Sequence, residues 1–219
     1  RVLSTETPST TPAPRGRDGS LNDVRAAVPP ECYEQPTGRA VFAITQGALL
    51  WLAPIVALVL TDAAWWSPAL VALVGLGVAG LFVLGHDCSH RALFRSATVN
   101  RHVARWCMVP SLHNEAAWDL GHNRIHHGYT TRIGFDFVWH PVTVEEYRAL
   151  SRKDRLRHRL EWSMFGSGAY YFRAVWWEKM MRFSPEGKRG AAYKRDNRQL
   201  FATFAVLVAA MATIGAFQG

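Results

Sequence analysis

Lysine and arginine are absent from residues 40–90 and from residues 199–219, although the chain contains 25 of them and has a formal net charge of +8. A charge at the centre of a bilayer costs roughly 2.5–3.5 kcal/mol even on the lenient insertion scale, so membrane segments avoid such residues. The gaps therefore exclude an evenly charged soluble surface. Because the basic residues flank apolar runs, we interpret them as orientation signals and expect no nucleic-acid partner.

Cysteine and one acidic motif are also scarce. The three cysteines, Cys32, Cys88 and Cys107, are too few for a disulfide framework, which favours a reducing compartment. No glutamate stands three residues before any histidine. This excludes the Glu-x-x-His motif with which soluble di-iron helix bundles bind their metals.

Three long apolar runs predict membrane-spanning helices over residues 40–61, 69–84 and 200–217. At about 1.5 Å per residue, the first reaches about 33 Å, enough to cross the hydrocarbon core. The turn between the first two runs has no basic residue, so the N-terminus and residues 86–198 should face the cytoplasm. The predicted fold is all-α: an integral, multi-pass membrane protein with a cytoplasmic helical cap.

The chain divides by composition at about residue 36. Residues 1–36 are rich in Ser, Thr, Pro and Arg, and we expect a flexible cytoplasmic tail. Residues 37–219 are expected to form one domain, with mixed stretches suited to helices lying at the membrane surface. Because the last apolar run stops at Gly219, we expect the domain to be incomplete at its C-terminus.

Five of the nine histidines form two tight clusters, His86-Asp-Cys-Ser-His90 and His122-Asn-Arg-Ile-His126-His127. In an α-helix, residues i and i+4 lie on one face, so His86 can pair with His90, and His122 with His126. His127 is turned about 100° further, towards a neighbouring metal. These five histidines are therefore predicted to bind two metal ions. Four others are isolated, and we expect surface or hydrogen-bonding roles for them: His102, His113, His140 and His158.

The donor type limits the metal and its surroundings. Imidazole suits Fe, Cu, Zn and Ni. Asp87-x-x-His90 and Asp119-x-x-His122 place carboxylates near the clusters, where they can accept an imidazole N–H and fix its tautomer. A zinc protease is an alternative, because the first cluster nearly reads HExxH, but it leaves the second cluster unused. A non-catalytic metal- or haem-binding membrane protein is the alternative of another class.

The two clusters and their surroundings resemble the membrane fatty acid desaturases, particularly the acyl-lipid omega-6 (delta-12) and omega-3 branch. The first cluster resembles that branch's H-[DE]-C-x-H box. The resemblance covers roughly residues 40–219 and includes these further residues: Gly85, Arg91-Ala-Leu-Phe-Arg-Ser96, Val99-Asn100, Pro110, Trp118, Gly134-Phe-Asp136, Trp139, Pro141-Val-Thr143 and Glu146-Tyr147.

The resemblance implies a site and a reaction. The five clustered histidines would bind two non-haem iron ions that react with O2, and Asp136 would join Asp87 and Asp119 as supporting residues. The reaction would be O2-dependent desaturation of fatty acyl chains in membrane lipids. Electrons would come from a ferredoxin or a b-type cytochrome.

Two departures from the family pattern matter. Many acyl-lipid desaturases have HxxHH as the second box, whereas this chain has HxxxHH, a spacing that also occurs in alkane monooxygenases and carotenoid hydroxylases or ketolases. Hydroxylation, ketolation or alkane oxidation on the same scaffold is therefore the closest alternative. The family's third box, another HxxHH, is not in these 219 residues. We expect this N-terminal portion alone to be inactive.

Overall fold

A computed structural model of the chain describes residues 20–61, 65–130, 132, 134–136, 138, 142–182 and 185–216. The chain divides into two compact units, Arg1–Glu34 and Gln35–Gly219. In the first unit, α1 (Leu21–Ala26) begins at a capping box and is followed by the 3₁₀ helix η1 (Pro30–Tyr33). The described part of the predicted tail thus contains two short helices, and residues 1–19 lie outside the described residues.

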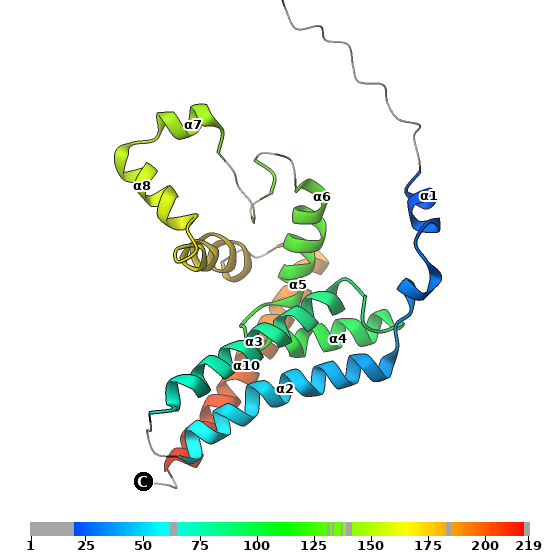
Figure 1. Cartoon of the computed structure of the whole chain (residues 1–219), viewed down its shortest axis with the longest axis vertical. Coiled ribbons are helices and arrows are strands. Elements are labelled where there is room, and N and C mark those ends of the chain that lie inside the picture. The colour runs from blue at the N-terminus through cyan, green and yellow to red at the C-terminus, as the bar shows by residue number, and fades with distance from the viewer. Residues whose placement is uncertain are drawn as a thin grey trace, which may run out of the picture. The chain divides into compact units, whose positions relative to one another are not determined.

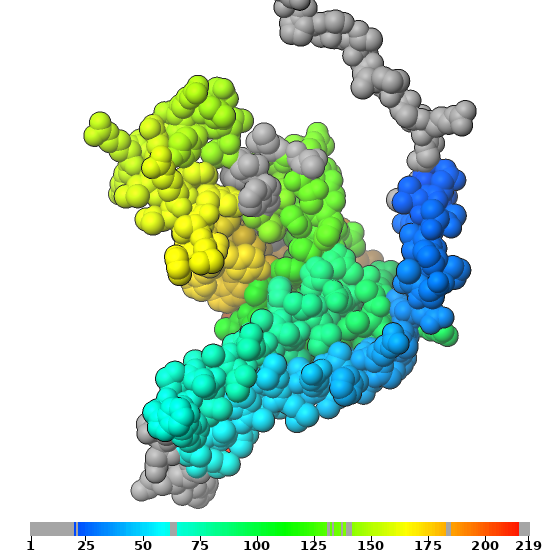
Figure 2. Space-filling view, in the orientation of Figure 1, coloured from blue at the N-terminus to red at the C-terminus, as the bar shows by residue number. Residues whose placement is uncertain are grey.

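The second unit begins with a helical hairpin made of α2 (Thr37–Leu60) and α3 (Ser67–Ser89). The two helices pack along one another, as Figures 1 and 2 show. Both are long and apolar enough to cross a membrane, in agreement with the spans predicted over 40–61 and 69–84. The second helix continues five residues beyond the predicted end, so it contains His86 and ends at Ser89, with His90 as its C-cap.

Two glycines allow neighbouring helices to approach α3 closely. A Cβ atom on Gly77 would lie 2.6 Å from the backbone of Trp51 in α2. A Cβ atom on Gly85 would lie 2.9 Å from the side chain of Met108, at the end of α4 (Ala97–Met108). Only glycine fits such contacts. The second contact fixes α4 against α3 immediately before His86.

The second histidine cluster lies on a π-helix. After α5 (Glu115–Trp118), η2 (Asp119–His126) has π geometry, and the short α6 (His127–Tyr129) continues it. A π-helix has i→i+5 hydrogen bonds, so residues five apart lie near the same face, as residues four apart do. The expectation of a regular α-helix here was wrong, and the difference changes which histidines meet.

The long helix α10 (Gly187–Ala216) combines a polar first half with an apolar second half. It is the third helix able to cross a membrane, over Gly187–Ile214, and it starts well before the predicted span of 200–217. Its polar half is bound to the start of α5. Asn114 Nδ2 donates to the Tyr193 carbonyl at 3.0 Å, and the Ala116 N–H donates to Asp196 at 3.2 Å.

Four shorter helices complete the described structure: α7 (Val144–Ala149), α8 (Arg152–Glu161), α9 (Ser167–Tyr170) and the π-helix η3 (Tyr171–Met181). The core between η3, α5 and α10 contains Met108, Trp118, Val175, Met180 and Tyr193. Residues 20–216 contain no strand wherever the structure describes them, so the predicted all-α class is confirmed.

Candidate metal centre

The first histidine cluster lies on the last turn of α3. His86 and His90 are one α-helical turn apart, and their Nε2 atoms are 3.2 Å from each other. The His86 Nδ1–H donates to the Asp87 carboxylate at 2.9 Å. Because a neutral imidazole has one donor and one acceptor nitrogen, this bond leaves the Nε2 lone pair of His86 directed at its neighbours.

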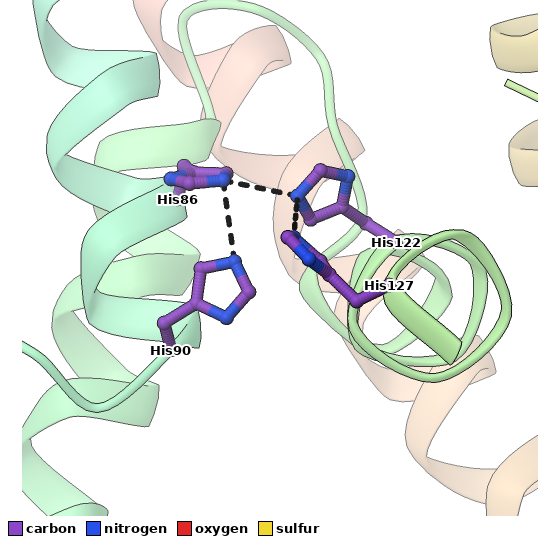
Figure 3. A group of neighbouring side chains, drawn as sticks. All are labelled: His86, His90, His122 and His127. Atoms are coloured by element: carbon purple, nitrogen blue, oxygen red, sulfur yellow. Dashed lines mark hydrogen bonds between the residues drawn. The ribbon is translucent and has the colours of Figure 1, made fainter. Parts of the chain in front are cut away.

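The second cluster contributes His122 and His127 to the same point. His122 Nε2 lies 3.0 Å from His86 Nε2 and 3.1 Å from His127 Nε2 (Figure 3). The spacing of five residues between His122 and His127 matches the π-helical hydrogen bonding of η2. The α-helical expectation paired His122 with His126 instead, so that pairing is corrected.

The four imidazoles His86, His90, His122 and His127 form a group that can hold a metal ion. One ligand atom from each lies within 4.8 Å of all the others. Two nitrogens bound to one metal at about 2.1 Å are separated by roughly 3.0–3.4 Å, the range of the closest contacts here. The close nitrogens are at hydrogen-bonding distance here, and imidazole nitrogens at this separation can also converge on one cation, so the donor set fits a metal.

Burial keeps two members of this group, His90 and His122, in the metal-binding form. Desolvation, followed by repulsion from His86 and His127, lowers the pKa of His122 to about 3. The pKa of His90 is lowered by burial and then by its histidine neighbours. At neutral pH both rings are therefore uncharged, and the neutral imidazole is the form that binds metals.

His126 lies beside the group and not in it. Its ring centroid is 5.1 Å from that of His122, and its Nδ1–H donates to Asp136 at 2.7 Å. Asp136 is 2% exposed, and its other oxygen accepts the Val138 N–H at 2.9 Å. The carboxylate is thus held from two sides, and it directs the Nε2 lone pair of His126 away from the bond.

Asp119 supports the connection between the clusters through its contacts with Asn123 and Arg124. It accepts from Asn123 Nδ2 at 3.3 Å and pairs with Arg124 at 3.4 Å. The same Asn123 amide donates to the carbonyl and the hydroxyl of Ser89 at 3.1 and 2.8 Å. Asn123, which the sequence analysis did not single out, therefore joins η2 to the end of α3.

Aromatic side chains form the wall behind His122. Trp118, one helical turn earlier, stacks on the His122 ring with centroids 4.3 Å apart and an interplanar angle of 20°. Phe82 packs edge-on against Trp118. Trp118 Nε1 and His122 Nδ1 are buried and have no hydrogen-bond partner among the described residues. The stack therefore helps to fix the plane of the His122 ring, whose Nδ1 has no hydrogen bond to do so.

His113 anchors this wall. Its Nδ1 lies 2.7 Å from the Ser111 carbonyl and its Nε2 lies 2.9 Å from the Tyr171 hydroxyl. Burial lowers the pKa of His113 to about 4, so the ring is neutral and donates to the Ser111 carbonyl while accepting from Tyr171. The expected hydrogen-bonding role is confirmed for His113, whereas His140 lies outside the described residues.

Comparison with known proteins adds an independent observation. The sequence profile of one family, described as fatty acid desaturase, matches residues 63–219. The chain is similar to an sn-1 oleoyl-lipid 12-desaturase of Anabaena variabilis, at 27% identity over 65% of this chain and 42% of the relative. The enzyme of that name from Synechocystis sp. is 31% identical over 70% and 44% of the two chains.

A further relative from Synechocystis sp., an sn-1 acyl-lipid omega-3 desaturase (ferredoxin), is 28% identical over 63% of this chain and 38% of its own length. The chain thus spans less than half the length of each of these relatives. No solved structure matches it.

Proposed function

The chain belongs to the fatty acid desaturase family, and from this premise we propose that it carries two of the histidine boxes of an O2-dependent desaturase of lipid acyl chains. The observation that carries the proposal is the meeting of four imidazoles from two separate helices at the end of an apolar hairpin. A site at that level can receive an acyl chain directly from the bilayer.

The histidines have distinct roles in this proposal. His86, His90, His122 and His127 bind the first iron, and His126 binds the second from its place beside the group. Two non-haem iron ions, when bound, supply the reduction of O2 that makes removal of hydrogen from an unactivated methylene possible. The chain's own contribution is to hold neutral imidazoles in place and to leave positions open for O2.

The aspartates support these ligands. Asp87 and Asp136 accept the Nδ1–H of His86 and His126, which fixes the tautomer and makes Nε2 the ligand atom. Asp119 supports the histidines only indirectly, because it accepts a hydrogen bond from the Asn123 amide that joins the two boxes. We expect all three to affect metal affinity without binding the metal.

The membrane arrangement follows from the apolar helices. We propose that α2, α3 and α10 cross the bilayer and that both boxes face the cytoplasm, where an electron donor can reach them. One relative is named as a ferredoxin-dependent enzyme, which favours ferredoxin over a b-type cytochrome as the donor. The names of two others favour an oleoyl lipid as the substrate.

Hydroxylation is the second candidate, and the HxxxHH spacing of the second box favours it. Both reactions begin with removal of one hydrogen from the acyl chain. They differ in whether a second hydrogen is lost or an oxygen is added. Only the product distinguishes them.

The test uses the full-length gene product in a host whose membranes contain oleoyl lipids but no diunsaturated ones. Fatty acids are analysed by gas chromatography and mass spectrometry, and non-haem iron is measured in the purified protein. We expect a new double bond with the native sequence and none with His122→Ala, which removes the ring that contacts both His86 and His127.

His102→Ala is the matched control, because His102 is an exposed histidine of α4 outside the group. It should retain more than half of the product. A hydroxylated product from the native protein would establish the second candidate. Unchanged desaturation by His122→Ala would reject the ligand assignment while leaving the reaction itself in place.

A further inference from the structure

A cavity of about 310 Å³ lies between α3, α4, α5–η2 and α10. Cys88 and Ser89 line it from α3, and both lie between the ligands His86 and His90 in the sequence. At 100° per residue, Cys88 lies about 200° around the helix from both histidines. Cys88 therefore faces away from the imidazole group, and none of the four histidines of that group lines the cavity.

Arginine dominates the lining of this cavity. Glu115 and Asp119 are the carboxylates that line it, and six arginines face them. We name it the arginine cavity after its basic residues, which are Arg91, Arg101, Arg105, Arg124, Arg189 and Arg195.

Half of these arginines already have acidic partners. Arg105 pairs with Asp196 at 3.1 Å and with Glu115 at 3.7 Å, Arg195 pairs with Asp196 at 3.1 Å, and Arg124 pairs with Asp119 at 3.4 Å. Both carboxylates that line the cavity, Glu115 and Asp119, therefore already have an arginine partner.

Arg91, Arg101 and Arg189 form no close ion pair with a described carboxylate. Arg101 acts only at longer range on Glu115, whose pKa is raised by burial and lowered by Arg105 and, more weakly, by Arg101. They come from three different segments and converge on one cavity, which leaves an excess of positive charge there. A guanidinium binds a phosphate oxygen pair through two parallel N–H bonds, and it does so better than an ammonium. Three such groups around one cavity fit a phosphate ester.

Two helix starts add to this potential. Ala97 is the first residue of α4 and Arg189 lies in the first turn of α10, and both line the cavity. The first turn of a helix has unpaired N–H groups and the positive end of the helix dipole, which favour an anion. The backbone and the side chains therefore favour the same ligand.

The position of the cavity indicates where the phosphate comes from. If α3 and α10 cross the bilayer as proposed, the cavity lies just beyond the end of the apolar part of α3 and before that of α10, at the level of the lipid headgroups. Basic pockets between spanning helices at this level bind phospholipid headgroups. A protein partner would need a surface of roughly 1,000 Å² or more, not a recess of this volume.

We propose that the arginine cavity binds a phosphate ester, and that in the membrane this ligand is the phosphodiester of an anionic phospholipid. The lipid is a resident ligand, distinct from the acyl chain that is oxidised. It neutralises Arg91, Arg101 and Arg189 and holds together the three segments that carry them around the cavity.

The test measures lipid binding to the full-length protein, purified in detergent and stripped of native lipid. Short-chain phosphatidylglycerol is titrated and followed by native mass spectrometry, with inorganic phosphate and short-chain phosphatidylcholine as further probes. We expect Arg101→Gln/Arg189→Gln to weaken phosphatidylglycerol binding by more than about tenfold, because it removes two charge-assisted contacts.

Lys188→Gln/Lys194→Gln is the matched control. It removes the same charge from exposed positions of α10 outside the cavity, and we expect a change of less than about twofold, within the small effect of remote exposed charges. Arg101→Lys/Arg189→Lys keeps the charge but loses the paired N–H geometry, so its affinity should be intermediate. This variant keeps the test valid if the glutamine variant misfolds.

Three results would overturn the proposal. Equal losses in the cavity variant and the control would show diffuse charge and no site. Binding of inorganic phosphate as tight as that of phosphatidylglycerol would reject the lipid source. Unchanged lipid binding combined with slower reduction by ferredoxin would assign the arginines to an acidic protein partner. Each result is independent of whether the enzyme forms a double bond.

Discussion

The two histidine boxes reach one point by different backbone geometries. His86 and its partner His90, the C-cap of the regular α-helix α3, are four residues apart, whereas His122 on the π-helix η2 and His127, its C-cap, are five residues apart. Each pair presents Nε2 atoms about 3 Å from a neighbour. The number of residues between two histidines therefore predicts whether their side chains meet only when the type of helix that carries them is known.

The second box, HxxxHH, has one residue more than the HxxHH of many acyl-lipid desaturases, and the π-helix η2 accommodates this residue. In an α-helix, HxxxHH would place His126 in register with His122 and turn His127 away. In the observed structure His127 contacts His122 through Nε2, while His126, whose ring lies 5.1 Å from that of His122, bonds to Asp136. Short π-helical segments occur frequently at functional sites of proteins.

The largest difference in metal affinity should appear between alanine variants of the last two histidines, His126 and His127. His127→Ala removes a member of the four-ring group, so we expect Co²⁺ affinity, read from visible absorption, to fall by more than about 100-fold, beyond the usual loss for a supporting residue. His126→Ala should keep this affinity within about tenfold, because its ring lies outside the group. The same His126 variant should form no unsaturated product, since it lacks the proposed ligand of the second iron. A larger loss of Co²⁺ affinity in His126→Ala would mean that α-helical pairing holds.

The second largest effect, on iron content and product formation, should come from the carboxylates of Asp136 and Asp87. Asp136→Asn should lower iron content and product formation by about 10- to 100-fold, the range for a carboxylate that orients a ligating histidine. Asp87→Asn should cost less, because the Asp87 side chain is 42% exposed and water can replace it. Iron analysis of the two purified variants measures the difference. Equal losses would contradict the importance of burial at Asp136.

Deleting Ile125 tests whether the second histidine box tolerates the loss of one residue better than the first box does. The deletion turns HxxxHH into HxxHH, so His122 and the last histidine become four residues apart and can meet on a regular α-helix. We expect less than about a tenfold loss of Co²⁺ affinity, because the π-bulge contains one surplus residue. Deleting Ser89 is the control, since α3 has no surplus residue and Ser89 bonds Asn123; it should abolish binding. Similar losses in both deletions would refute the difference between the boxes.

The smallest effect should come from the connection between the boxes. Asn123→Ala removes the amide that donates to Ser89, a loss of about 1–2 kcal/mol for partly buried hydrogen bonds. We expect a few-fold lower Co²⁺ affinity and a lower midpoint of thermal denaturation. Arg124→Gln, at the exposed neighbouring position, should leave both unchanged. If the two variants behave alike, Asn123 does not hold the boxes together.

Hydropathy and charge predicted the helical class and the positions of three spans, because apolar length and missing charge are visible in the sequence. They did not predict where the helices end. Residues 85–89 of α3 and 187–199 of α10 are polar, and their helices persist because tertiary contacts pair the backbone and side chains there. Tertiary contact overrides a local hydropathy signal.

The sequence also indicated the histidines of the site but not their grouping. Spacing alone assumes one helix geometry, and no local signal in His122–His127 predicts a π-helix. Trp118 could have been found, because it lies one turn before His122 and stacks on it. The bond from Asn123 to Ser89 crosses 34 residues of sequence and required the structure. The metal-ligand assignments remain predictions.

The continuity of α10 has a mechanical consequence. At about 1.5 Å per residue its 30 residues form a rod about 45 Å long, more than the roughly 30 Å of a bilayer core. Membranes of different thickness change the tilt of such a rod. Because the helix is unbroken and Asn114 and Ala116 bond to its polar half, a tilt inside the lipid would move the start of the second histidine box.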